Sequence, residues 1–266
     1  MKTAGPVTEA GYWNALWRGR PALQPIDPHK GGLRNYAYRH LHREFMALLA
    51  DEAPAGKTLF EAGCGGSRWL AYFHRTHGCR VAGMDYSPDG CGMVQEMLER
   101  LSVEHHIVTG DVFDPPADFP GGFDFVFSNG LLEHFTDTPG AVAACAAFLR
   151  PGGLMITLIP NMTGAPGWLQ RFFDRELYEK HVPLDCAQLA EAHRQAGLEI
   201  TVSHYVMLAH LGVIQFGAME RLIGARPLQV LKLALSAPLW GLGPLLGMRP
   251  NHITSPFILC AARKPA

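Results

Sequence analysis

The chain has 266 residues, of which 48% are hydrophobic, and its formal net charge at pH 7 is −1. A chain of this length can bury a large core, so we expect a single domain over residues 1–266. A nearly neutral chain without a run of five or more Lys and Arg residues lacks the basic surface on which binding to a phosphate backbone depends. Nucleic acid is therefore excluded as an expected partner.

The N-terminus and the cysteines indicate the compartment. The first residues contain no apolar segment of the kind found in secretory signals, so we expect a cytoplasmic protein. The six cysteines form no C-x-x-C pair and no cluster with histidine at the spacing of a zinc site. We therefore expect reduced thiols, no disulfide framework and no metal site.

Residues 1–52 are predicted to be helical and to lie beside the core. Tyr12 shares with Trp13, Leu16 and Trp17 the spacing of one face of a short helix. This helix either packs on the surface of the domain or forms an aromatic lid over a cofactor, with Tyr12 as the candidate contact. After a loop rich in proline and glycine, a second helix is predicted to lead into the first strand.

A glycine-rich turn over residues 60–67 follows a short apolar strand and precedes a helical pattern. A turn of this kind brings backbone N–H groups close to a ligand, and Glu61 adds a carboxylate beside them. The dinucleotide-binding fingerprint would need a third glycine where Arg68 stands. The turn therefore predicts a cofactor cradle in which a pyrophosphate is disfavoured.

Three predicted strands end in an acidic residue. Glu61, Asp85 and Asp111 stand at successive junctions between strands and helices, in an alternation typical of a parallel sheet covered on both faces. Because ligands of open α/β sheets bind at the carboxyl ends of the strands, these carboxylates are expected to converge on one ligand. Asp85 is placed to accept hydrogen bonds from both hydroxyls of a ribose.

Six short motifs follow one another along this part of the chain. They are Glu61-x-Gly63-Cys64-Gly65, Gly83-Met84-Asp85-Tyr86-Ser87, Gly110-Asp111-Val112-Phe113, Phe123-Asp124-Phe125-Val126, Leu131-Leu132-Glu133-His134-Phe135 and Leu149-Arg150-Pro151-Gly152-Gly153. In this order and spacing they resemble the motifs of class I S-adenosylmethionine-dependent methyltransferases, over residues 58–206 and the last strand. The resemblance implies a Rossmann-like, doubly wound α/β sheet of seven strands in the order 3-2-1-4-5-7-6, with the last strand antiparallel. Residues 53–206 and 256–264 would form this core.

The resemblance also implies S-adenosylmethionine as the cofactor. A cationic sulfur without a phosphate suits a site with carboxylates at three strand ends. The residues that the resemblance assigns are Gly63, Cys64 and Gly65 at the methionine part, Glu61 at the loop or the ammonium group, Asp85 at the ribose, Tyr86, Asp111 and Val112 at the adenine, and Ser128 and Asn129 at the sulfonium.

Methyl transfer needs a general base only when the acceptor must lose a proton. His134 belongs to a Glu-His pair that is common in the family after the fourth strand, and it either organises the turn or takes part in catalysis. His181 is the other candidate, because an imidazole can accept a proton near neutral pH. The alternative for His181 is a structural role in the segment that contains it.

Two segments outside the core are expected on the acceptor side. Residues 162–183 mix aromatic and basic side chains, which favours an acceptor with a ring or alkyl portion and an anionic group, although solvent-facing ion pairs explain the same charges. Residues 207–255 contain a helical pattern over 228–235, which Pro238 and the glycines after it are expected to break. For this segment we favour a cap on the domain over a surface that touches a membrane or admits a lipid-like acceptor.

These observations predict a methyltransferase that acts on a small molecule, with transfer to oxygen slightly favoured over transfer to nitrogen. One alternative is a nucleotide-dependent oxidoreductase on a Rossmann-like sheet. Another is a non-catalytic protein that binds S-adenosylmethionine without turning it over. The sequence carries no signal for an oligomeric state.

Overall fold

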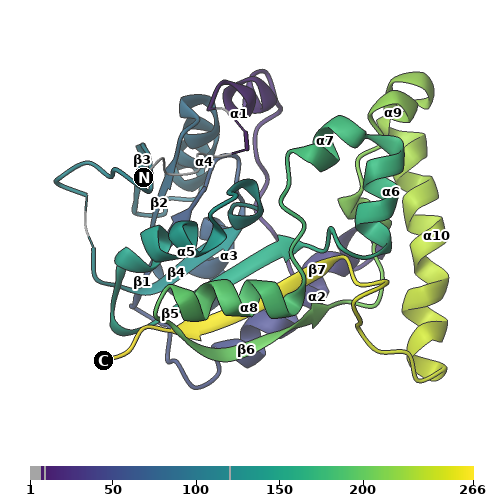
Figure 1. Cartoon of the computed structure of the whole chain (residues 1–266). Helices are drawn as coiled ribbons and strands as arrows, with labels where there is room; N and C mark the ends of the chain where they lie inside the picture. The colour runs from purple at the N-terminus through teal and green to yellow at the C-terminus, as the bar shows by residue number, and fades with distance from the viewer. Residues whose placement is uncertain (1–6, 9, 120) are drawn as a thin grey trace.

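The computed structural model describes residues 7–8, 10–119 and 121–266 and is built around one seven-stranded sheet (Figure 1). The strand order is β3-β2-β1-β4-β5-β7-β6, and β7 runs antiparallel to both of its neighbours. The predicted topology is therefore confirmed. The strands are β1 (Thr58–Ala62), β2 (Arg80–Asp85), β3 (His105–Thr109), β4 (Phe123–Asn129), β5 (Leu149–Pro160), β6 (Glu199–Val206) and β7 (Phe257–Arg263).

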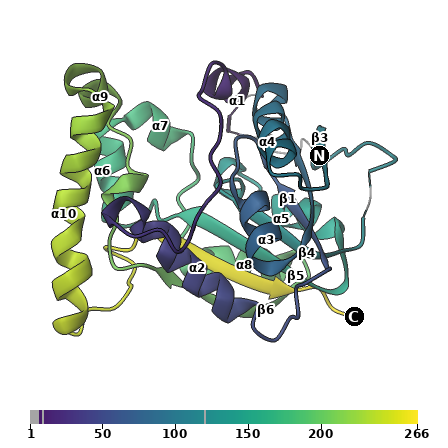
Figure 2. The ribbon, with the colours of Figure 1, turned by 180° about the vertical axis from the view of Figure 1, so that it is seen from behind.

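Helices cover both faces of the sheet, and a further group lies beyond the end of the sheet at which β5 ends and β7 begins (Figures 1 and 2). The helices near the sheet are α1 (Ala10–Trp17), η1 (Leu33–Asn35), α2 (Tyr36–Leu48), α3 (Trp69–His77), α4 (Pro88–Arg100), η2 (Leu132–His134), α5 (Thr138–Ala147) and α8 (Cys186–Gln195). The outer group consists of α6 (Ala165–Phe173), α7 (Arg175–Glu179), η3 (Leu211–Val213), α9 (Gly217–Ile223) and α10 (Ala225–Leu245).

Successive strand residues point to opposite faces, which divides the core in two. Leu59 packs with α2, α3 and α4 in one buried cluster, whereas its neighbour Phe60 packs with α5 in the other. Leu259 and Ile258 of β7 are divided in the same way. This alternation of buried side chains is why the apolar runs of the sequence form central strands.

Local signals set the ends of several helices. The Ser87 hydroxyl accepts a hydrogen bond from the N–H of Gly90 at 3.0 Å, and Pro88 begins α4. Asp185 and Gln188 form a capping box at the start of α8. These caps fix where each helix leaves the sheet.

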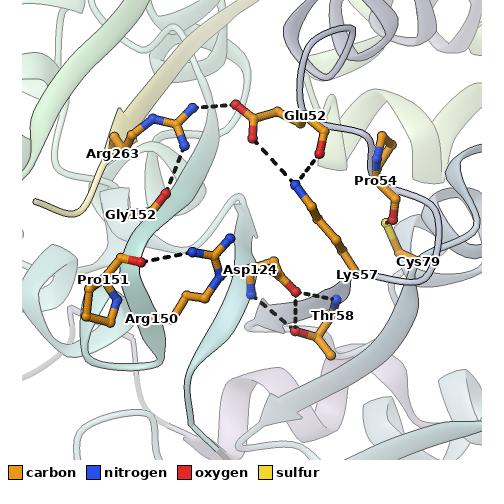
Figure 3. A network of polar contacts seen from close by, with 10 residues as sticks. All are labelled: Glu52, Pro54, Lys57, Thr58, Cys79, Asp124, Arg150, Pro151, Gly152 and Arg263. Carbon is orange, nitrogen blue, oxygen red and sulfur yellow. Dashed lines mark hydrogen bonds and ion pairs between the residues drawn. The ribbon is translucent and has the colours of Figure 1, made fainter. Parts of the chain in front are cut away.

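A polar network lies at the end of the sheet where β1, β4 and β5 begin and the antiparallel β7 ends, opposite the glycine turn (Figure 3). The Asp124 carboxylate accepts hydrogen bonds from the N–H of Thr58 at 2.9 Å and from Nε of Arg150 at 2.8 Å. Arg263 pairs with Glu52 and donates to a backbone carbonyl of β5. The network therefore ties β1, β4, β5 and β7 together at one end and leaves the other end to the site.

Helix α10 continues to Leu245, so the prediction that Pro238 breaks it is wrong. A proline inside a helix removes one backbone hydrogen bond, which normally favours a kink or an end. Here the second half is anchored by Trp240, whose ring stacks on Tyr36 at a centroid distance of 3.9 Å. Its Nε1–H also donates to the carbonyl of Ala209 at 2.5 Å. Throughout the described ranges, no helix has the length and apolar character needed to cross a membrane.

Candidate active site

The glycine turn and the end of β2 form one hydrogen-bonded unit. The N–H groups of Gly63 and Cys64 donate to the carbonyl of Met84 at 2.9 and 3.1 Å. The N–H of Gly65 donates to the Asp85 carboxylate at 2.8 Å, and a Cβ on Gly65 would stand 2.7 Å from that carboxylate. Only a glycine leaves room for this approach.

Asp85 also accepts a hydrogen bond from the N–H of Ser87 at 2.8 Å. Burial raises the pKa of Asp85, although the N–H groups of Ser87 and Gly65 oppose this effect. One carboxylate thus organises two backbone turns and still lines the space above them.

A first cavity, of about 690 Å³ and partly open to solvent, lies over this unit. Six of the predicted cofactor residues line it: Gly63, Gly65, Asp85, Tyr86, Val112 and Asn129. Its lining contains one carboxylate and neither Lys nor Arg among the described residues. Such a lining suits a cationic ligand better than a diphosphate.

Helix α1 covers the first cavity. Trp13 and Trp17 both line it, and a Cβ on Gly66 would stand 2.4 Å from the Trp17 ring. The Asn14 side chain accepts hydrogen bonds from the Ser87 hydroxyl at 2.9 Å and from the N–H of residue 89 at 3.2 Å. The helix is therefore docked on the start of α4, over the glycine turn.

Tyr12, the predicted contact from α1, lies outside the lining of the first cavity. Its ring is 5.1 Å from the Lys180 ammonium, just after α7. The aromatic cover is supplied instead by the neighbouring tryptophans of the same helix. A cofactor role for Tyr12 stays a prediction.

Four other predicted cofactor residues support the cavity from behind. Glu61 accepts a hydrogen bond from the Ser67 hydroxyl at 2.7 Å, and burial raises the pKa of Glu61 to about 8. Cys64 and Ser128 are fully buried, and Asp111 accepts a hydrogen bond from the backbone N–H of residue 113. The Oε2 of Glu61 and the Oγ of Ser128 have no hydrogen-bond partner among the described residues. The Oγ of Ser128 could accept a hydrogen bond from a ligand ammonium after a small shift, and a bound cation would favour the charged form of Glu61.

Glu133, His134 and His181 form a cluster beside the first cavity, and their candidate ligand atoms lie within 4.8 Å of one another. Nδ1–H of His134 donates to the carbonyl of Lys180 at 2.7 Å, and Nδ1–H of His181 donates to that of Leu177 at 2.7 Å. Burial raises the pKa of Glu133 to about 8, so its carboxyl is protonated at neutral pH and is a poor cation ligand. The expectation of no metal site stays a prediction.

The two predicted catalytic histidines are thus neighbours, with ring centroids 4.7 Å apart. His134 lines the first cavity, whereas His181 does not. Burial and the nearby His181 lower the pKa of His134 to about 4. His134 is therefore neutral at pH 7, with its Nδ1 engaged by a backbone carbonyl.

A second, larger cavity of about 1480 Å³, partly open to solvent, lies between η1 and α2 on one side and η3, α9 and α10 on the other. Asn129, at the end of β4, is the residue that the linings of both cavities share among the described residues. The second cavity is lined by apolar side chains that include Leu158, Leu228, Leu233 and Phe257, and by the charged residues Arg34, Arg68, Glu220 and Lys232.

Arg68 stands where a dinucleotide-binding turn would have its third glycine. Its guanidinium donates to the Tyr38 hydroxyl at 3.0 Å and to the carbonyl of Pro25 at 3.2 Å. The side chain thereby holds the loop before α2 against the start of α3. This contact accounts for an arginine at that position.

His210 lines the second cavity and was not singled out from the sequence. Its buried Nδ1 has no hydrogen-bond partner among the described residues. Burial, followed by the charge of Lys232, lowers the pKa of His210 to about 4, so the imidazole is neutral at pH 7. A neutral imidazole with an unpartnered nitrogen can accept a hydrogen bond from a ligand hydroxyl.

Comparisons with known proteins agree with this geometry. Residues 33–203 match the methyltransferase domain family. A probable S-adenosylmethionine-dependent methyltransferase of Mycolicibacterium smegmatis is 31% identical over 196 residues, which cover 70% of this chain and 69% of the relative. A ubiquinone biosynthesis O-methyltransferase of Rhodopseudomonas palustris is 30% identical over 155 residues, but the aligned part spans only 57% of this chain and 58% of that relative. Geranyl diphosphate C-methyltransferase from Streptomyces coelicolor shares the fold, with a TM-score of 0.60 at 16% identity over 98% of this chain and 99% of that one.

Proposed function

Because the chain belongs to the class I S-adenosylmethionine-dependent methyltransferases, we propose that it transfers a methyl group to an oxygen atom of a small molecule held in the second cavity. The proposal depends on one observation above all, the meeting of the two cavities at Asn129. A donor in the first cavity and an acceptor in the second would face each other across this residue.

The lining of the first cavity supports the cofactor of the family. Gly63 and Gly65 would lie against its amino-acid part, and Asp85 would accept hydrogen bonds from its ribose hydroxyls. Trp13 and Trp17 would exclude water from above. When bound, S-adenosylmethionine supplies a methyl group on a cationic sulfur, and the chain's task is to align the acceptor and keep water out.

The second cavity supports an acceptor that is largely apolar and carries a hydroxyl group. Its leucine and phenylalanine walls would bury a ring or an alkyl chain, and Arg34 would meet an anionic group. The name of the Rhodopseudomonas palustris relative supports transfer to oxygen. The basic residues of 162–183 supply no part of either lining, so an anionic group of the acceptor would have to meet other side chains.

We assign to His210 the role of accepting a hydrogen bond from the acceptor hydroxyl, which would orient the acceptor oxygen towards the donor. The unpartnered Nδ1 and the neutral state of the ring at pH 7 support this role, whereas a pKa of about 4 makes the imidazole a weak base. This assignment differs from the sequence-based candidates, because His134 lines the other cavity and His181 lines neither.

The test is a screen of hydroxylated aromatic and alkyl acceptors, with release of S-adenosylhomocysteine as the readout. His210→Gln should lower kcat about tenfold on any acceptor found, because the acceptor oxygen would be less well oriented, and should leave calorimetric binding of S-adenosylhomocysteine unchanged. His252→Gln is the matched control, since this exposed histidine lines neither cavity. Equal turnover in the two variants would remove His210 from the chemistry, and turnover on amines alone would contradict transfer to oxygen.

A further inference from the structure

Helix α10 presents a long apolar face to solvent, although it also carries polar residues that bond to the rest of the protein. The residues of its outer face are Val230, Leu231, Ala234, Leu235, Pro238, Leu239, Gly241, Leu242, Leu245 and Leu246, none of which is polar or charged. We call these residues the α10 outer face. Leu242 is 59% exposed and Leu245 is 81% exposed.

Lys232 and Ser236 of the helix point inward and are satisfied there, whereas Arg226 and Gln229 are exposed. Nζ of Lys232 donates to the carbonyl of Ile214 at 2.6 Å. The hydroxyl of Ser236 accepts from the N–H of Leu211 at 3.1 Å and donates to the carbonyl of Lys232 at 2.8 Å. These contacts, with the buried Trp240, fix the rotation of the helix about its axis. The apolar side is therefore held outward by specific contacts and does not result from loose packing.

A surface helix usually turns its apolar side to the core. Helix α10 buries Leu228 and Trp240 but leaves a second apolar side in solvent. The helix has 21 residues and is thus about 30 Å long, so the outer face is large for an apolar surface left in water. In Figures 1 and 2 the helix lies along one edge of the molecule, with the sheet on its other side. No described segment covers its outer face.

The charges around the helix indicate what kind of partner would cover the α10 outer face. Exposed Arg226 stands at the start of α10 and exposed Arg249 stands just after its end. After Glu220 the sequence contains no Asp or Glu. An apolar face flanked by cations at both ends complements a bilayer with anionic headgroups, in which apolar side chains enter the acyl boundary and the arginines meet phosphates.

We propose that the α10 outer face lies in the surface of a membrane that contains anionic phospholipid, with the helix parallel to the bilayer plane. Binding of this kind needs neither cofactor nor turnover, so it goes beyond the proposed function and can fail or hold independently of it. If the second cavity takes an acceptor, the same helix connects the two, because Leu228 and Leu233 of α10 line that cavity. An apolar acceptor could then pass from the bilayer into the site along this helix.

Flotation of the whole chain with vesicles tests the proposal. We expect the protein to float with vesicles of phosphatidylcholine and phosphatidylglycerol, and to float much less with phosphatidylcholine alone. Leu242→Glu should lower the affinity for the mixed vesicles at least about tenfold, since it places a charge in the apolar boundary. Met46→Glu is the matched control, because Met46 is 47% exposed on α2 and lies away from α10. Its flotation should equal that of the wild type.

Substitution of the two flanking arginines measures the electrostatic contribution to membrane binding separately from the apolar contribution. Arg226→Gln and Arg249→Gln should each lower the affinity for the mixed vesicles about fivefold, an effect that added salt should remove. Calorimetric binding of S-adenosylhomocysteine should be the same in all variants, which shows that they are folded. No flotation of the wild type at low salt, or equal flotation of Leu242→Glu and Met46→Glu, would overturn the proposal. A dimer in sedimentation velocity that Leu242→Glu dissociates, without vesicle binding, would instead give the face to a second copy of the chain.

Discussion

The backbone N–H of Gly65 and the carboxylate of Asp85 are joined by a hydrogen bond of 2.8 Å, which connects the turn after β1 to the end of β2. The two parts of the predicted cofactor cradle are therefore one structural unit. A ligand that binds to the glycine turn also depends on the acid that positions it. This relationship leads to the first prediction.

Asp85→Ala should weaken binding of S-adenosylmethionine and S-adenosylhomocysteine about a hundredfold. Each hydrogen bond to a charged group contributes about 1.5–3 kcal/mol, and the substitution also releases the N–H of Gly65. Calorimetric titration measures the change. Asp118→Ala removes the same charge from an exposed loop position outside both cavities and should bind normally. An unaltered affinity in Asp85→Ala would contradict the assignment of this residue.

Cofactor binding should change the intrinsic fluorescence, and Trp17 should carry much of the change. The Trp17 ring lies in the first cavity against the glycine turn, so a ligand that enters must alter its surroundings. Trp17→Phe should remove at least about half of the signal seen on titration with S-adenosylhomocysteine. Trp168→Phe is the control, because that ring is 66% exposed on α6 and lines neither cavity. The idea of α1 as a cover fails if both variants keep the full signal.

The buried Glu133 should make the fold less stable as the pH rises. Burial raises its folded-state pKa to about 8 from an ordinary value of 4.5, so its contribution to stability is complete below about pH 4.5 and is lost as the pH rises towards 8. Between pH 5 and pH 9 the free energy of unfolding of the wild type should fall relative to that of Glu133→Gln by about 4 kcal/mol. Urea unfolding at both pH values measures this difference.

The comparison with Glu133→Gln isolates one group, because the similarly shifted Glu61 is present in both proteins and cancels. Exposed Glu191 supplies the control, and Glu191→Gln should follow the wild type at every pH. Parallel curves for the wild type and Glu133→Gln would show that the carboxyl of Glu133 is not held in its protonated form.

Asp124→Asn should destabilise the fold by about 2 kcal/mol without changing cofactor affinity. Burial disfavours its charge, but hydrogen bonds from Thr58 and Arg150 outweigh this effect and lower the pKa of Asp124. Its contribution is therefore present above about pH 4 and is lost as the pH falls through the lowered value. Glu179→Gln breaks an exposed pair with Arg175 and should cost less than about 0.5 kcal/mol. Equal midpoints of urea unfolding for the wild type and Asp124→Asn at pH 7 would show that this network adds nothing to the stability of the fold.

Much of the fold follows from local patterns. The strands predicted to end at Glu61 and Asp85 correspond to β1 and β2, with ends that agree within one residue. The sheet order came from the resemblance, since periodicity alone does not order strands. The segment around Pro238 was misjudged because a local rule for proline takes no account of a distant anchor such as the stacking of Trp240 on Tyr36.

The residues of the candidate site also differ in whether the sequence alone could predict them. Asp85 could be predicted because it stands next to a motif at a strand end, where chain position and spatial position agree. His210 could not, because the second cavity is assembled from segments far apart in the sequence and a lone histidine carries no spacing signal. Within α1, the aromatic face was recognised but its orientation was not, since the periodicity does not say whether Tyr12 or Trp13 points inward.

Asn129 lines both cavities, and each of them is partly open to solvent. With the donor in one cavity and the acceptor in the other, each would enter and leave from its own cavity, and neither would block the other. Such a site imposes no compulsory order of addition, so initial-rate patterns should follow a random mechanism. S-adenosylhomocysteine would return to water while the methylated product leaves beside α10. One turnover would then combine a donor from water with an acceptor from the membrane.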